Sequence, residues 1–306
     1  FKKLFEKKNL IKFENIVLKK LDNLIKCKVD FIKIDVEGEE YEALLGMKQI
    51  LKKYKPKLII AGWSAYPRDL DFKRFKKIAT KSNSLLLADI AHPSGLIAAG
   101  LYSNPIPYCD FVTTTTHKTL RGPRGGMIMM KEEHAKIINS RVFPGTQGGP
   151  LMNMIAAKAV AFKEALEDSF KDYQKQVLIN SRLLADILIK NEFQCITGGT
   201  DTHLVLLDLR ESGLTGKEAE EALSEAGITT NKNAIPFDSQ PPTIASGIRI
   251  GTPGITTRGM KEDEINQIAN LITKVLKNHK NNNVLKSCKK EVNDLCSRFP
   301  IYSYLL

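Results

Sequence analysis

The chain has 306 residues, 42% of them hydrophobic and 26% charged, a balance typical of a globular protein with room for two domains. No apolar run is long enough to cross a bilayer, and Phe1–Lys8 has no secretory signal, so we expect a cytoplasmic protein without membrane contacts. The net charge of +12 comes without a basic stripe interleaved with aromatic residues, which favours a lysine-rich surface over nucleic-acid binding.

The first predicted elements form one β-α-β unit. Val29–Asp35 has the pattern of a buried strand that ends in a carboxylate. Glu39–Lys53 carries leucines, a methionine and an isoleucine at helical spacing, and Leu58–Ile60 is a second strand behind Pro56.

The same alternation continues through the next part of the chain. The pattern predicts a helix over Phe72–Lys81 and strands over Leu85–Asp89, Phe111–Thr115 and Met127–Met130. Strands that alternate with helices in this order indicate a mostly parallel sheet with covering helices.

Two long helices follow, and after them the predicted elements become shorter. Residues 151–192 have helical spacing throughout, and beyond Gly198 the strands and helices become shorter, which indicates a small C-terminal α+β domain. Its predicted elements are strands at Leu204–Asp208 and Ile248–Ile250, helices at 215–226 and 261–277, and a surface loop at Asn278–Asn283.

Lys118 is the first candidate for chemistry. It follows a hydrophobic strand and precedes a glycine-rich turn, so its amine can reach a ligand at the carboxyl end of that strand. Desolvation and neighbouring cations lower the pKa of such an amine enough for Schiff-base formation. The competing interpretation is a solvated surface lysine or a simple anion contact.

Asp89 and His92 form the second candidate group, also at the end of a strand. Pyridoxal phosphate needs a carboxylate facing its pyridine nitrogen, because the protonated ring withdraws electrons more strongly. A turn-capping aspartate beside a structural histidine explains the pair equally well in isolation. Asp89 and Lys118 both follow hydrophobic strands, however, so they can meet at one edge of the sheet. The five cysteines are widely spaced without a C-x-x-C pair, so we expect neither disulfides nor a metal site.

The segment Thr116–Gly126, Thr-His-Lys-Thr-Leu-Arg-Gly-Pro-Arg-Gly-Gly, resembles the active-site signature of serine hydroxymethyltransferases almost letter for letter. The resemblance runs from Lys55 to about Tyr302. It includes Ala61–Arg68, Phe143–Leu151, Ser246–Pro253, Thr256–Gly259 and Asp294–Tyr302.

This resemblance implies an α/β fold, the fold type I of pyridoxal-phosphate-dependent transferases (aspartate aminotransferase-like). It divides the chain into a truncated, PLP-binding large domain over residues 55–195 and a small C-terminal domain over residues 196–306. The implied activity is the interconversion of serine and glycine with tetrahydrofolate as one-carbon acceptor. The implied assembly is a homodimer.

By position, the resemblance assigns Lys118 as the Schiff-base lysine and Asp89 as the partner of the ring nitrogen. It places His92 and Ser64 near the ring hydroxyl and the substrate, with His117 as a pocket neighbour.

Three further assignments lie later in the chain. The backbone N–H of Gly149 would contact the cofactor phosphate across the dimer interface, and Arg249 would clamp the carboxylate of the amino acid with its forked guanidinium. A surface salt bridge is the alternative for Arg249. Residues 233–237 would line the folate side.

Residues 1–54 do not resemble the family's N-terminal portion, which supplies a tyrosine, a glutamate, a ring-stacking histidine and a phosphate-binding Ser-Gly pair. Val29–Glu40 instead resembles the tail of an FkbM-type S-adenosylmethionine methyltransferase, without that family's glycine-rich loop; a structural turn is the alternative interpretation. Because the chain starts without methionine and the two resemblances meet at Lys55–Ile60, we expect a piece of a longer frame, joined by recombination or by an assembly artefact.

Because the family's N-terminal portion is missing, we expect the activity to be impaired, and three alternatives to it stay open. The first is a catalytically inactive chimeric fragment that binds pyridoxal phosphate or associates with intact subunits. The second is residual threonine aldol cleavage, which needs no folate. The third, favoured least, is a methyltransferase.

Overall fold

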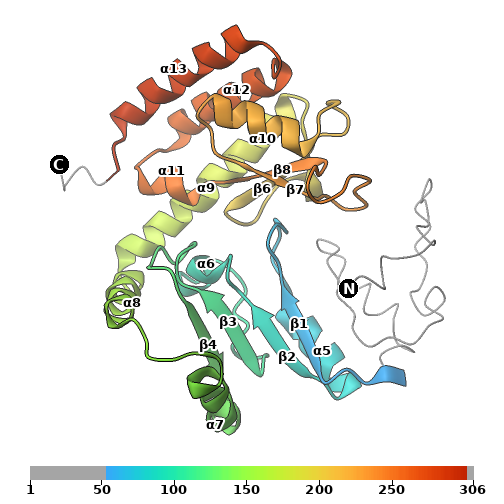
Figure 1. Ribbon diagram of the computed structural model, residues 1–306, viewed down its shortest axis with the longest axis vertical. Coiled ribbons are helices and arrows are strands. Elements are labelled where there is room, and N and C mark those ends of the chain that lie inside the picture. The colour runs from blue at the N-terminus through green and yellow to red at the C-terminus, as the bar shows by residue number, and fades with distance from the viewer. Residues whose placement is uncertain (1–52, 302–306) are drawn as a thin grey trace.

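The computed structural model describes residues 53–301, which form two packed units joined by long helices (Figure 1). The strand predicted at 29–35 and nearly all of the helix predicted at 39–53 lie outside the described residues, as does the end of the chain beyond 301. Among residues 53–301, no helix combines the length and the apolar character needed to cross a membrane.

The first unit is built on a four-stranded sheet in the order β1-β2-β3-β4. The first three strands run parallel and the fourth is antiparallel, which confirms the mostly parallel sheet predicted from the sequence. The strands are β1 (Leu58–Gly62), β2 (Leu85–Asp89), β3 (Phe111–Thr115) and β4 (Gly126–Met130).

Helix α5 (Phe72–Ser82) covers one face of this sheet. It begins at Asp71, whose Oδ1 accepts a hydrogen bond from the backbone N–H of Arg74 (3.0 Å), and ends at Asn83 in the left-handed region. Its buried apolar residues recur at helical spacing and share one core with alternate residues of the strands. On the opposite face Ile60 is 59% exposed.

Four helical segments surround the sheet or lead away from it. They are α6 (Ser94–Ala98), α7 (Glu132–Ser140), the π-helical turn η1 (Arg141–Thr146) and α8 (Met152–Ala165).

The second unit has a four-stranded antiparallel sheet in the order β5-β6-β8-β7, which confirms the predicted α+β character. Strand β6 is buried along its whole length under helices that fill the larger of the two main cores. The elements are β5 (Gln194–Cys195), η2 (Ile196–Gly198), β6 (Leu204–Asp208), α10 (Gly216–Glu225), β7 (Asn231–Asn233), β8 (Gly247–Gly251), α11 (Pro253–Thr257), α12 (Glu262–Lys277) and α13 (Asn282–Arg298).

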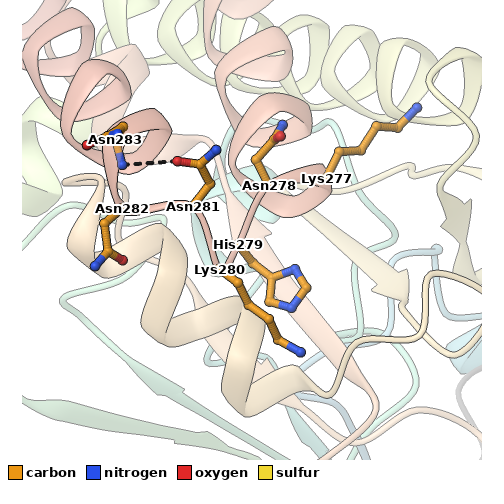
Figure 2. Close-up of a pocket in the computed structure, with 7 residues that line it drawn as sticks. All are labelled: Lys277, Asn278, His279, Lys280, Asn281, Asn282 and Asn283. Atoms are coloured by element: carbon orange, nitrogen blue, oxygen red, sulfur yellow. Dashed lines mark hydrogen bonds between the residues drawn. The ribbon is translucent and has the colours of Figure 1, made fainter.

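The connection between α12 and α13 is shorter than the loop predicted over Asn278–Asn283, because α13 begins at Asn282. Figure 2 shows that its side chains are polar or cationic and that Asn281 turns back onto the new helix. Asn281 Oδ1 accepts hydrogen bonds from the backbone N–H groups of Asn283 (3.1 Å) and Val284 (3.3 Å), so it caps α13.

Helix α9 (Asp168–Lys190) runs from the first unit into the second, as Figure 1 shows. Leu178 belongs to the core under the first sheet, whereas Leu184, Ala185 and Leu188 belong to the core of the second. One continuous helix therefore serves both cores.

Candidate active site

The candidate residues of the first unit gather at one edge of the parallel sheet. Register pairs Gly62 with Asp89 and Asp89 with Thr113, so the carboxyl ends of β1, β2 and β3 lie side by side. Asp89 ends β2, and His92 and Lys118 each follow a strand by three residues. Parallel strands thus bring together residues that are up to 29 positions apart in the sequence.

Gly62 allows the first two strands to approach closely beside Asp89. A β-carbon at position 62 would lie 2.5 Å from the carbonyl oxygen of Asp89 and 2.8 Å from its β-carbon. Real side chains do not tolerate such distances, so the position of the Asp89 carboxylate depends on a glycine at this point.

Lys118 lies in a partly desolvated site close to opposite and like charges. Burial lowers the pKa of its amine, the carboxylate of Asp89 opposes that effect, and the guanidinium of Arg249 lowers the pKa further. Asp89 itself is exposed, and its Oδ1 accepts a hydrogen bond from the backbone N–H of Ala91 (3.0 Å). The amine of Lys118 therefore loses its proton more readily than a surface lysine does.

The loop that carries Lys118 is fixed by the buried hydroxyl of Thr119. Its Oγ1 donates to the carbonyl of His92 (2.6 Å) and accepts from the N–H of Gly95 (2.9 Å). The carbonyl of Thr119 accepts from Nε2 of Gln174 (2.8 Å). These bonds tie the loop that carries Lys118 to the loop that carries His92.

His92 is buried with its Nδ1 bonded to no residue of the described part of the chain. Burial, followed by the charges of Lys118 and Arg249, lowers the pKa of its imidazole to about 3. The ring lies against Trp63 (centroids 5.5 Å apart) and against His203 (5.7 Å). His92 is therefore neutral at physiological pH, and its Nδ1 is a buried polar atom without a hydrogen-bond partner among the described residues.

Arg249 enters the site from β8 of the second unit. Its Nη1 donates to the carbonyl of Ser64 (2.6 Å), and its Nη2 lies 3.4 Å from Oδ1 of Asn231. Across residues 53–301 no carboxylate pairs with it, so the surface salt bridge considered from the sequence does not form there. A half-buried guanidinium with free donors is suited to an anionic ligand.

The sequence matches a known protein family. The family model for serine hydroxymethyltransferase matches residues 24–272, most of the chain. The chain belongs to the serine hydroxymethyltransferase family. In this family the fold is that of type I pyridoxal-phosphate enzymes, with which the mostly parallel sheet and its helices are compatible. The match begins at residue 24, ahead of Lys55, where the resemblance to this family was expected to begin. It therefore covers Val29–Glu40, whose resemblance to an FkbM-type methyltransferase stays a prediction.

The structure places His117 and Gly149, two further predicted site residues, in different surroundings. The pKa of His117 is lowered, first by burial and then by the charges of Arg124 and Lys118. A hydrogen bond between its ring and the backbone of Gly125 has the opposite effect and raises that pKa. Gly149 is exposed and lines a groove of about 1050 Å³ between β4, α7 and α8, which none of the other predicted site residues lines. Within one chain, Gly149 is thus not brought to the Lys118 cluster.

The sequence pattern did not single out four residues that shape this site. Gly62 sets the approach of two strands, Thr119 ties two loops together, and Trp63 and His203 form the walls around His92. The role of Gly62 depends on the register that pairs it with Asp89, which the sequence alone does not give.

Proposed function

We propose that this protein is a pyridoxal-phosphate-dependent serine hydroxymethyltransferase that interconverts serine and glycine with tetrahydrofolate as the one-carbon acceptor. The observation that carries the proposal is that a partly buried Lys118, its pKa lowered, lies within the electrostatic influence of the Asp89 carboxylate at the carboxyl edge of the sheet. The membership of the chain in this family supplies the reaction class.

The residues present fit the cofactor. Lys118 offers a nucleophilic amine, Asp89 an exposed carboxylate for a protonated ring nitrogen, and His92 a buried Nδ1 without a partner among the described residues. Lys118 and Arg249 supply two positive charges against one negative charge, which suits a molecule that carries a phosphate. When bound, pyridoxal phosphate supplies an electron sink for negative charge at the α-carbon of the amino acid.

Each protein group has a definite task in this proposal. Lys118 would hold the cofactor through its side-chain amine, because its lowered pKa makes the neutral, nucleophilic form of that amine accessible. Arg249 binds the carboxylate of serine or glycine through the donors that Ser64 leaves unused. His92, neutral because of its burial, accepts or gives a hydrogen bond without adding charge.

Three assignments lie at the periphery. His117 is a pocket neighbour, and Ser64 adjoins the substrate. Residues 233–237 line the folate side; Asn233 ends β7, and Phe237 is exposed with a positive φ of 56°.

The proposal includes a homodimer in which the Gly149 loop reaches the phosphate in the other subunit. Helix α8 supports it: the helix is apolar around most of its circumference, yet Ala161 is its only fully buried residue. An exposed apolar helix of this kind is typical of a surface that a second copy covers. Sedimentation at micromolar concentration tests this, and a monomer with full activity would contradict it.

The decisive experiment is chemical labelling. The protein is mixed with pyridoxal phosphate, reduced with borohydride and mapped by peptide mass, with Lys118→Ala and the surface variant Lys175→Ala as a matched pair. We expect one adduct on Lys118 that is lost only in Lys118→Ala. Label scattered over surface lysines would contradict the proposal. Cofactor binding without serine cleavage would identify an inactive member, and cleavage of threonine alone an aldolase.

Arg249→Lys tests the substrate clamp separately. A lysine keeps the charge but loses the forked geometry, so we expect KM for serine to rise about 10- to 100-fold, corresponding to a charged hydrogen bond of ~1.5–3 kcal/mol. Affinity for pyridoxal phosphate should change much less. An unchanged KM would remove Arg249 from the substrate site.

A further inference from the structure

Three flat rings meet beside Lys118, two from the first unit and one from the second. The centroids of Trp63, His92 and His203 are 5.5, 5.7 and 6.0 Å apart, and their planes differ by only 18° to 29°. The three centroids thus form a nearly equilateral triangle, in which each ring contacts both others.

His203 directly precedes β6, and its backbone is held on both sides. Its carbonyl accepts a hydrogen bond from the N–H of Thr252 (3.1 Å), and the neighbouring Thr202 accepts one from Leu204 through Oγ1 (3.2 Å). Its Nδ1, by contrast, is buried without a partner among residues 53–301. Burying an unpartnered imidazole is unfavourable for folding, so its presence calls for a reason other than stability.

Trp63 is the rigid wall of the triangle. Its Nε1 donates to Oη of Tyr102 (3.0 Å), and that oxygen also accepts from the N–H of Leu70 (3.0 Å) and lies 3.2 Å from the carbonyl of Arg68. No hydrogen bond among the described residues fixes the ring of His92, so its orientation depends on the two rings that it contacts.

We propose that His203 is a positioning residue of the cofactor site: its ring, supplied by the second unit, holds the imidazole of His92 against Trp63. The consequence for the cofactor rests on the proposed function, whereas the contact between the two imidazoles does not. The placement of His92 then depends on how the second unit docks onto the first.

Electrostatics supports this arrangement. The pKa of His203 is held well below its usual value, first by burial and then by the facing groups His92, Arg249 and Lys118. A positive imidazole beside the two cations Lys118 and Arg249 is thereby avoided. Removal of the ring would admit water to His92, weaken the main cause of its low pKa and return that pKa toward about 6.5.

The test uses the only tryptophan of the chain, Trp63, as a reporter in the protein without cofactor. A protonated imidazole in contact with an indole quenches its fluorescence, so emission follows the charge of the neighbouring histidines. His203→Phe keeps a flat ring, His203→Ala removes it, and His134→Ala removes a histidine that packs on Phe111 instead (4.7 Å). His203→Asn replaces His203→Ala if the latter does not fold.

We expect the parent, His203→Phe and His134→Ala to keep constant emission from pH 8 to 5. In His203→Ala, quenching should appear with a midpoint at least about two pH units above that of the parent. In the same variant, affinity for pyridoxal phosphate should fall about tenfold and the absorbance maximum of the bound form should shift, while His203→Phe stays close to the parent.

Two results would overturn the positioning role: a His203→Ala titration that matches the parent, or a His203→Phe variant that is as impaired as His203→Ala. If the parent binds no pyridoxal phosphate, the proposed function fails, and the fluorescence titration still decides whether His203 holds His92.

Discussion

Replacing Thr119 by valine removes one hydroxyl and almost nothing else, because the two side chains have nearly the same shape. The hydroxyl donates to the carbonyl of His92 (2.6 Å) and accepts from the N–H of Gly95 (2.9 Å), and Thr119 is buried. The valine variant would leave both backbone groups buried without a partner. Each such group costs ~1–3 kcal/mol, and some relaxation of the two loops is expected, so the free energy of unfolding should fall by about 2–4 kcal/mol.

Thr119→Ser is the matched control, since it keeps the hydroxyl and loses only a buried methyl group. Its cost should be about 1 kcal/mol. Urea unfolding followed by the fluorescence of Trp63 measures both variants, because that residue lies in the same unit. A loss below about 0.5 kcal/mol in Thr119→Val, or a serine variant as unstable as the valine variant, would refute the view that this hydroxyl ties the two loops together.

Other consequences of the structure are equally testable. Gly62→Ala should displace Asp89 and weaken pyridoxal-phosphate binding about tenfold or more. Gly254→Ala is the control and should leave binding unchanged, because an added β-carbon there meets no other atom. Equal affinities of the two variants in an absorbance titration would contradict this prediction. Folding lowers the pKa values of His92 and His203, so their contribution to the free energy of unfolding is fully present above about pH 6.5. Below that pH the free energy of unfolding should fall by up to ~1.4 kcal/mol per pH unit for each imidazole. A free energy of unfolding that stays constant from pH 7 to 5 would show that the two imidazoles are not buried as neutral groups. Asp110 accepts hydrogen bonds at its buried carboxylate from Lys131 Nζ and from the N–H of Leu86, so Asp110→Asn should cost ~1.5–3 kcal/mol in urea unfolding, and a neutral result would refute the structural role of that ion pair.

Strands of the first sheet were predictable because continuous apolar runs between turn residues allow few other structures. Leu85–Asp89 and Phe111–Thr115 have the predicted bounds. Helix α7 was not predicted: it is nine residues long and buries none of them, so no apolar periodicity marks it. Strand β7, with the sequence Asn-Lys-Asn, has no intrinsic preference for a strand and is formed by pairing with β8.

Helix α13 shows the opposite situation, since a signal was present in the sequence. Leu285, Cys288, Val292 and Leu295 recur at intervals of three and four and are all buried. Their spacing is that of an amphipathic helix, but the asparagines at its start indicated a loop. The structure resolves the conflict, because Asn281 acts as the cap of the helix.

Parallel pairing made part of the site predictable. Asp89 and Lys118 could be placed at one edge because both follow strands of a parallel sheet. The contact of Arg249 with Ser64 spans 185 residues and depends on how the two units dock. The same holds for His203 against Trp63, for which no local pattern exists.

Helix α9 contributes residues to both cores, and this limits how such a chain can recombine during evolution. A recombination event preserves a fold only where few contacts cross the junction. A junction inside α9 would part Leu178 from Leu184 and Leu188, and so damage two cores with a single exchange. The exposed loop at 147–151 contributes no residue to either core, so a junction there would disturb the fold far less. Lineages that shuffle segments of this fold should therefore inherit α9 and everything after it as one block.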